Sequence, residues 1–176
     1  MTPRELDEYR ALRKTIRERG TARVWVFVAG LVAWAALVIA TAALAALPVA
    51  TLLPLLILAG TFEAVFGLHI GVERIGRYIQ VFFEEGSGWE HVVMAFGRGP
   101  RGTAVDPLFG NIFLVATLLN FVPVLIAEPV AMEVAVIGAA HVFFIARVLL
   151  ARRTARQQRA ADLERFQKLR QEPPRD

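Results

Sequence analysis

Long apolar stretches alternate with polar segments along the chain. The longest stretch carries no charged residue over 39 positions, from Val24 to Phe62. A helix of that length would be about 58 Å long, roughly twice the hydrocarbon core of a bilayer. Pro48 is therefore expected to divide it into two spans. With the apolar segments nearer the C-terminus, the pattern predicts four transmembrane helices, at 24–47, 49–72, 108–127 and 130–151.

Polar helices are predicted at both ends of the chain. Thr2 and Glu5 have the spacing of a capping box, and we expect Gly20 to end a first helix over 2–19. A second polar helix is expected over 152–171. Each has a thin apolar stripe at helical spacing, made of Leu6, Tyr9, Leu12 and Ile16 in the first and of Leu163, Phe166 and Leu169 in the second.

The middle of the chain is expected to hold an extension of the second span to about residue 85, a short helix over 89–96 and a loop over 97–107. Pro123 is expected to kink the third span. The predicted fold is an all-α integral membrane protein with a single four-helix transmembrane domain over 1–176. Its helices form two hairpins, with cytoplasmic amphipathic helices at the N- and C-termini.

Composition supports this class and the charges orient it. Hydrophobic residues make up 56% of the chain, charged residues 20%, and the mean hydropathy is +0.49. All 20 Lys and Arg residues fall in four segments, 4–23, 74–77, 98–101 and 147–175. By the positive-inside rule both termini and residues 73–106 are cytoplasmic. We expect a bacterial inner or plasma membrane, contact with anionic lipid, and no nucleic-acid partner.

Glu63 is the most informative polar residue, because an ionised carboxylate inside a span is costly. It is either a proton or cation site or a protonated group in a structural hydrogen bond. His141 and Asn120 lie in neighbouring spans, and the depths of Glu63 and His141 differ by only about 4.5 Å. The three residues form a candidate intramembrane polar site. A satisfied core histidine is the favoured interpretation of His141.

A second candidate cluster lies at the cytoplasmic face. His69, Glu73 and Arg77 recur every four residues and share one helix face. They are interpreted as an ion pair of Glu73 with Arg77 near His69 rather than as half of a metal site, and no catalytic residue, metal or cofactor is predicted. Gly60, Gly67 and Gly71 give the second span small faces, which favour close packing within the chain or between copies.

Residues 73–84, with the run Glu73-Arg74-Ile75-Gly76-Arg77 and Glu84, superficially resemble a motif of the glutathione-linked eicosanoid enzymes of the MAPEG family. The resemblance would imply a four-helix membrane enzyme. It covers about twelve residues. Val81 stands where the family has an asparagine, and the run closes the second helix instead of leading into it. The resemblance is therefore not adopted.

The residues leave three functions open. The leading one is a non-catalytic polytopic membrane subunit or scaffold that assembles with other membrane chains. The expected partners are other membrane protein chains or copies of this one. The second is a small homo-oligomeric transporter, channel or proton-coupled protein centred on Glu63 and His141. A membrane enzyme of the MAPEG type is third. The absence of cysteine excludes thiolate catalysis and disulfides.

The predicted topology can be tested by thiol labelling, because the chain has no native cysteine. Cysteines placed at Pro48 and Pro129 should react with an impermeant maleimide added outside intact cells. Arg98→Cys should react only after the membrane is permeabilised. Labelling of Arg98→Cys from outside would contradict the topology.

Overall fold

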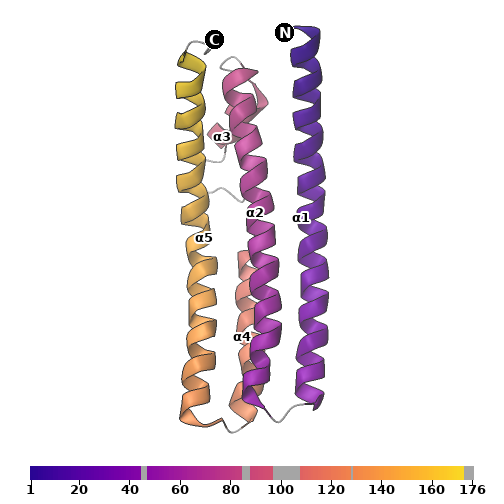
Figure 1. Cartoon of the computed structure of the whole chain (residues 1–176), viewed down its shortest axis with the longest axis vertical. Helices are drawn as coiled ribbons and strands as arrows, with labels where there is room; N and C mark the ends of the chain where they lie inside the picture. The colour runs from indigo at the N-terminus through magenta and orange to yellow at the C-terminus, as the bar shows by residue number, and fades with distance from the viewer. Residues whose placement is uncertain (45–46, 85–87, 97–107, 128, 173–176) are drawn as a thin grey trace. The chain divides into compact units, whose positions relative to one another are not determined.

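The computed structural model describes residues 1–44, 47–84, 88–96, 108–127 and 129–172. Within these ranges every regular element is helical (Figure 1). The elements are α1 (Pro3–Leu44), the 3₁₀ turn η1 (Pro48–Thr51), α2 (Leu52–Phe82), α3 (Trp89–Phe96), α4 (Gly110–Ile126) and α5 (Ala131–Gln171). Three of them, α1, α2 and α5, are long and apolar enough to cross a membrane, and α4 is a shorter apolar helix. The chain is thus all-helical in its described part, and its helices indicate a membrane protein.

Helix α1 is longer than expected. It runs unbroken through Gly20, so the expectation that this glycine ends a separate helix over 2–19 is wrong. A glycine inside a helix costs only about 1 kcal/mol relative to alanine, and cooperative propagation from long flanking segments offsets that cost. The capping box at its start is confirmed. The Thr2 N–H donates to Glu5 Oε2 (2.6 Å), and the Glu5 N–H donates to Thr2 Oγ1 (3.3 Å).

Helix α5 likewise runs unbroken from Ala131 to Gln171, so the segments predicted at 130–151 and 152–171 form one helix. The remaining boundaries lie close to their expected places. Pro48 opens η1, which separates α1 from α2. Helix α2 continues to Phe82, near the expected limit, and α3 confirms the helix over 89–96. Helix α4 passes through Pro123, and its kink stays a prediction. The loop expected over 97–107 lies outside the described residues.

The chain divides into two compact units. The apolar unit comprises Arg23–Phe66 and Asp106–Arg152, and the charged unit comprises Met1–Ala22, Gly67–Val105 and Arg153–Asp176. Helices α1, α2 and α5 each contribute a segment to both units. Helix α4 belongs to the apolar unit and α3 to the charged unit.

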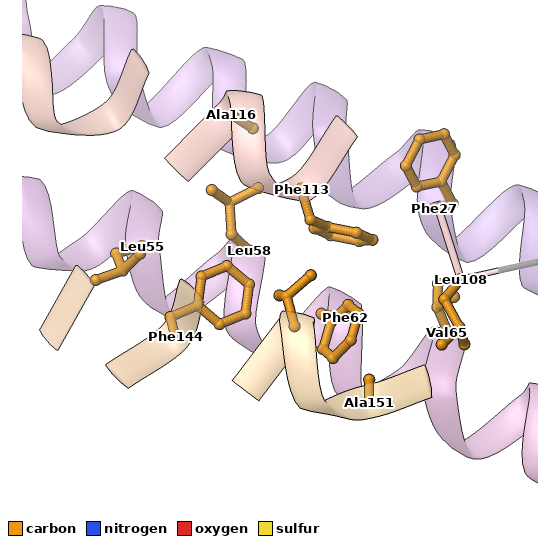
Figure 2. Close-up of a cluster of buried hydrophobic side chains, with 11 residues drawn as sticks. Phe27, Leu55, Leu58, Phe62, Val65, Leu108, Phe113, Ala116, Phe144 and Ala151 are labelled. Carbon is orange, nitrogen blue, oxygen red and sulfur yellow. The ribbon is translucent and has the colours of Figure 1, made fainter. Parts of the chain in front are cut away.

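The core of the apolar unit is aromatic (Figure 2). Each of its four helices contributes one buried phenylalanine: Phe27 from α1, Phe62 from α2, Phe113 from α4 and Phe144 from α5. The Phe62 ring meets Phe113 edge-on at 5.2 Å and Phe144 edge-on at 5.9 Å between ring centroids. Edge-to-face contacts of this kind add about 0.5–1.5 kcal/mol each beyond the area they bury. Because lipid is as apolar as these rings, packing rather than water exclusion holds this core in a membrane.

The charged unit packs its terminal helical segments through aromatic side chains. Tyr9 of α1 lies 5.8 Å from Phe83, and Phe166 of α5 lies 5.6 Å from Tyr78. One residue of each predicted terminal stripe therefore packs against protein. The far ends of the stripes, Leu6 and Leu169, are exposed.

One tight helix contact in the apolar unit involves a glycine outside the predicted set. A Cβ on Gly30 of α1 would overlap the side chain of Thr61 on α2. By contrast, a Cβ on Gly60 or Gly67 would meet no atom within 4 Å, and one on Gly71 would lie 2.5 Å from Arg19 Nη1. Gly60 and Gly67 therefore do not mediate close packing within the chain, which was one of the two predicted alternatives. The other alternative, close packing between copies, stays a prediction for both.

Gly30→Ala should lower the free energy of unfolding by about 1–3 kcal/mol, because the added methyl forces α1 and α2 apart at Thr61. Gly138→Ala is the matched control, since a Cβ there meets no atom within 4 Å, and it should be neutral or stabilising. Adding Thr61→Gly to Gly30→Ala should restore part of the loss. Thermal unfolding in a bilayer measures all three, and equal behaviour of Gly30→Ala and Gly138→Ala would contradict the contact.

Candidate functional site

Asn120 is the polar centre of the apolar unit. It is 1% exposed and lies on α4. Its Oδ1 accepts a hydrogen bond from the Trp34 indole N–H at 3.2 Å, and its amide donates to the Thr51 carbonyl at 3.0 Å. The second amide hydrogen faces His141 Nε2 at 3.1 Å. Asn120 thereby joins α1, η1 and α5 to α4, and its hydrogen-bonding capacity is well used.

The contacts of His141 define its tautomer. Its Nδ1 lies 2.8 Å from the Ile137 carbonyl, which can only accept, so Nδ1 carries the proton. Nε2 is then the acceptor for the Asn120 amide. A ring held in this way is neutral and buried. It packs edge-to-face against the Phe121 ring, with 5.0 Å between the ring centroids. This arrangement matches the favoured interpretation of His141 as a satisfied core histidine.

Glu63 takes a partner that the sequence did not single out. Arg147 of α5 donates through Nη2 to Glu63 Oε2 at 2.9 Å, and its Nε lies 2.8 Å from Oε1 as a second ion-pair contact. The guanidinium also lies over the Phe66 ring at 4.5 Å from its centroid. A charge-assisted hydrogen bond of this kind is about twice as strong as one between neutral groups. Even so, the Glu63 side chain is 51% exposed and that of Arg147 is 27% exposed.

The predicted intramembrane site is therefore split. Asn120 and His141 are brought together as expected, but the Glu63 carboxylate pairs with Arg147 and not with either of them. Counting residues along each helix predicts the depth of a side chain, and this was sufficient to place His141 near Asn120. The count does not predict in which direction each side chain points around its helix axis. The signal that could have found the pair is that Arg147 is the only Lys or Arg residue between 130 and 151.

An apolar groove adjoins the ion pair on the surface of the apolar unit. It has a volume of about 500 Å³. Glu63 and Arg147 lie beside leucine, alanine and phenylalanine side chains of α2 and α5, among them Leu56, Ala59 and Phe143. Leu56 is 67% exposed and Phe143 is 76% exposed. The Glu63–Arg147 ion pair thus lies on an exposed, apolar surface of the unit.

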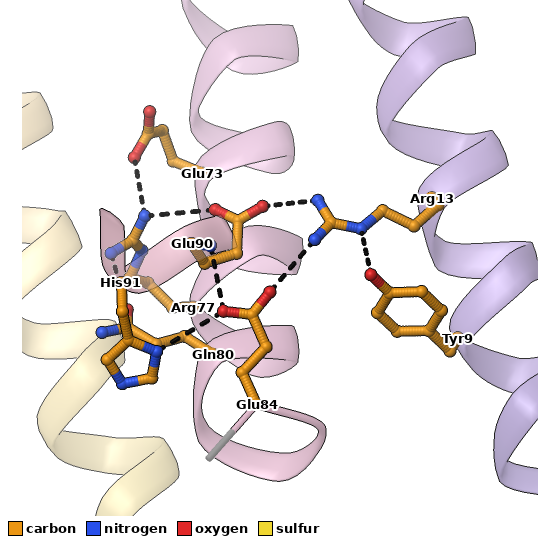
Figure 3. A network of polar contacts seen from close by, with 8 residues as sticks. All are labelled: Tyr9, Arg13, Glu73, Arg77, Gln80, Glu84, Glu90 and His91. Carbon is orange, nitrogen blue, oxygen red and sulfur yellow. Dashed lines mark hydrogen bonds and ion pairs between the residues drawn. The ribbon is translucent and has the colours of Figure 1, made fainter. Parts of the chain in front are cut away.

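The charged unit holds a larger network centred on Glu90 of α3 (Figure 3). Arg13 of α1 donates to Glu90 Oε1 at 2.6 Å and to Glu84 Oε1 at 3.1 Å. The other oxygen of Glu84 accepts from the backbone N–H of Glu90 at 2.9 Å and lies 3.4 Å from His91 Nδ1. The negatively charged carboxylates of Glu84 and Glu90 can lie close together here because the Arg13 guanidinium lies between them.

Arg77 extends this network along α2. Its guanidinium lies 3.7 Å from Glu90 and 3.9 Å from Glu73, and donates to Gln80 at 2.7 Å. The Glu73–Arg77 pair expected from their spacing is confirmed. Burial lowers the pKa of Arg77 overall, and the nearby carboxylates of Glu73 and Glu90 offset only part of this effect. Charge balance therefore fixes the site, since a buried guanidinium needs anions beside it.

Glu73 also connects the network to α5. Arg159 Nε lies 2.7 Å from Glu73 Oε2, an ion pair without hydrogen-bond geometry. His69, one turn before Glu73, is buried. Close by on α2, Arg74 donates to the buried Asp162 of α5 at 3.1 Å. These pairs hold α2 to α5 within the charged unit.

The Glu90 network should be structural, and Glu90→Gln tests this. The change leaves Arg77 buried beside one fewer anion. It should lower the free energy of unfolding by about 2–3 kcal/mol, somewhat less than the 3–5 kcal/mol of a fully buried pair because glutamine keeps one acceptor. Glu18→Gln is the control, since Glu18 pairs with Lys14 on an exposed helix face and should cost under about 1 kcal/mol. Thermal unfolding measures both variants. If Glu90→Gln and Glu18→Gln lower the free energy of unfolding equally, burial of the Glu90 network does not stabilise the fold.

The described residues include no group of three or more His, Asp or Glu side chains placed to hold a metal ion. The polar groups of the two units are instead paired with one another. The Asn120 amide pairs with the His141 imidazole, and the carboxylates of Glu63 and Glu90 pair with arginine guanidiniums. Comparisons with protein-family models, with curated proteins and with solved structures found no match.

Proposed function

We propose that this chain is a non-catalytic polytopic membrane subunit or scaffold that assembles with other membrane chains. The observation that carries the proposal is the Glu63–Arg147 pair, half-exposed on the apolar surface of α2 and α5. Polar groups within a span usually face a bundle interior, a cavity or a partner. Here they face outward beside an apolar groove, where another membrane helix can cover them.

The proposed topology has four spans, with α4 as the third. At 17 residues α4 is at the lower limit for crossing a bilayer. Four spans place both termini on one side, which agrees with the basic residues that both terminal segments carry. Three spans would place these two basic segments on opposite sides. The proposed location is a bacterial inner or plasma membrane, with the basic segments near anionic lipid on the cytoplasmic side.

The alternative of a transporter or proton-coupled protein centred on Glu63 and His141 gains no support from the geometry. The Glu63 carboxylate is bound to Arg147, and the His141 ring is bound to Asn120 and Ile137. A relay between Glu63 and His141 would need them in contact. The MAPEG-type enzyme is likewise unsupported, since Glu73, Arg77 and Glu84 are engaged in the network of the charged unit.

Native mass spectrometry of the chain in membrane-derived lipid particles tests the proposal. The wild-type particle should contain protein beyond one 19.4 kDa chain. Glu63→Leu should release the additional protein, because it leaves Arg147 as an uncompensated charge on the contact surface. Glu18→Leu, the same change on an exposed helix face of the charged unit, should leave the mass unchanged.

A wild-type chain that is always single in these particles would contradict the proposal. So would a reconstituted single chain that moves an ion or solute across liposomes.

A further inference from the structure

The exposed face of α2 has a regular arrangement around Glu63. Leu56, Gly60, Glu63, Ala64 and Gly67 are all exposed and occupy positions i, i+4, i+7, i+8 and i+11 of the helix, so they form one stripe. A side chain at Gly60 or Gly67 would meet no other part of the chain within 4 Å. The carboxylate therefore lies on a strip of the helix where a second backbone can approach closely.

The ion pair on this stripe is incompletely covered. With the Glu63 side chain 51% exposed, its remaining lone pairs face the surroundings of the helix. In hydrocarbon such groups are costly unless another polar group meets them. The occupant of this surface must therefore supply polar atoms at the depth of Glu63 as well as apolar surface for Leu56 and Phe143.

We propose that the occupant is a second copy of this chain, related by a twofold axis along the membrane normal and packed stripe to stripe along α2. This inference rests on the proposed function and names the partner. A twofold interface brings the same patch of both copies together, so the patch must complement itself. The Glu63–Arg147 pair carries both signs, and two such pairs form a neutral ring of two carboxylates and two guanidiniums.

Depth gives a second reason for a copy. Two copies inserted in the same orientation present Glu63 and Arg147 at identical depth without any further adjustment. Each Arg147 keeps N–H donors beyond the Nη2 group that donates to its own Glu63, and each carboxylate keeps lone pairs for further hydrogen bonds. The exposed groups are thus the ones that a second pair can satisfy.

A phospholipid fits the same surface less well. Its acyl chains match the groove at Leu56 and Phe143, but they carry no polar group for the pair. A headgroup phosphate would be attracted to Arg147 and repelled by Glu63, whose oxygens lie within 3 Å of the same guanidinium. A lipid would also leave Gly60 and Gly67 without a close neighbour.

Single-cysteine cross-linking in native membranes tests the copy interface, with no background because the chain lacks cysteine. Gly60→Cys and Gly67→Cys should each form a covalent dimer with copper phenanthroline. Val32→Cys on α1 and Leu118→Cys on α4, 65% and 61% exposed, are the matched controls and should stay monomeric. Equal cross-linking at all four positions would reflect random collision and overturn the inference.

Two further outcomes separate this inference from the proposed function. If a bismaleimide joins Gly60→Cys only to a different polypeptide, the occupant of the stripe is not a second copy, and the proposed role as a membrane subunit stands. If Gly60→Cys and Gly67→Cys join no protein and the native particle holds one chain, both are overturned.

Glu63→Gln gives an independent measurement by single-molecule counting of dimers in liposomes. It should weaken the dimer about 3- to 20-fold, the range of one interhelical polar contact. Glu133→Gln, a carboxylate change near the other end of the apolar segment of α5, should leave the dimer unchanged. No difference between these two variants would overturn the role of the ion pair.

Discussion

A charge placed in an apolar setting must be neutralised by a partner, and this constraint organises both units of the chain. In the apolar unit it joins Glu63 to Arg147 through an ion pair that includes one hydrogen bond. In the charged unit it gathers Glu73, Glu84 and Glu90 around arginines of α1, α2 and α5. Neither unit relies on apolar packing alone, because polar contacts specify which helix faces meet.

The two units use this constraint differently. The Glu90 network is more deeply buried, with Arg77 3% exposed, and its carboxylates are paired with arginines within the unit. Its effect is to fix α3 against α1 and α2. The Glu63–Arg147 pair is open on one side, and its unused hydrogen-bonding capacity points outward. Enclosure suits a structural role, whereas the open pair suits assembly.

Much of the helical architecture could be predicted from the sequence, because uninterrupted apolar runs and Pro48 mark helices strongly. The break at Gly20 failed because one glycine cannot overcome the cooperativity of a helix as long as α1. The helix pairs were harder to predict. Glu63 and Arg147 are 84 residues apart, and depth alone favoured His141 because it carries no information on rotation about the helix axis.

Local spacing predicted the Glu73–Arg77 pair, since residues four apart on a helix are neighbours. It could not predict that Arg13 of α1 would bridge Glu84 and Glu90, which depends on packing between distant segments. The small-residue motif likewise drew attention to Gly67 and Gly71. In the apolar unit the glycine without room for a side chain is instead Gly30, because Thr61 of another helix lies against it.

A double-mutant cycle on Glu63 and Arg147 tests the central claim most directly. The free energy of unfolding in a bilayer would be measured for the wild type, Glu63→Gln, Arg147→Gln and the double variant. The account predicts a coupling energy of about 1 kcal/mol or more, with the double variant more stable than the sum of the single losses implies. Strictly additive losses would contradict it, because they would mean that the two charges do not depend on each other.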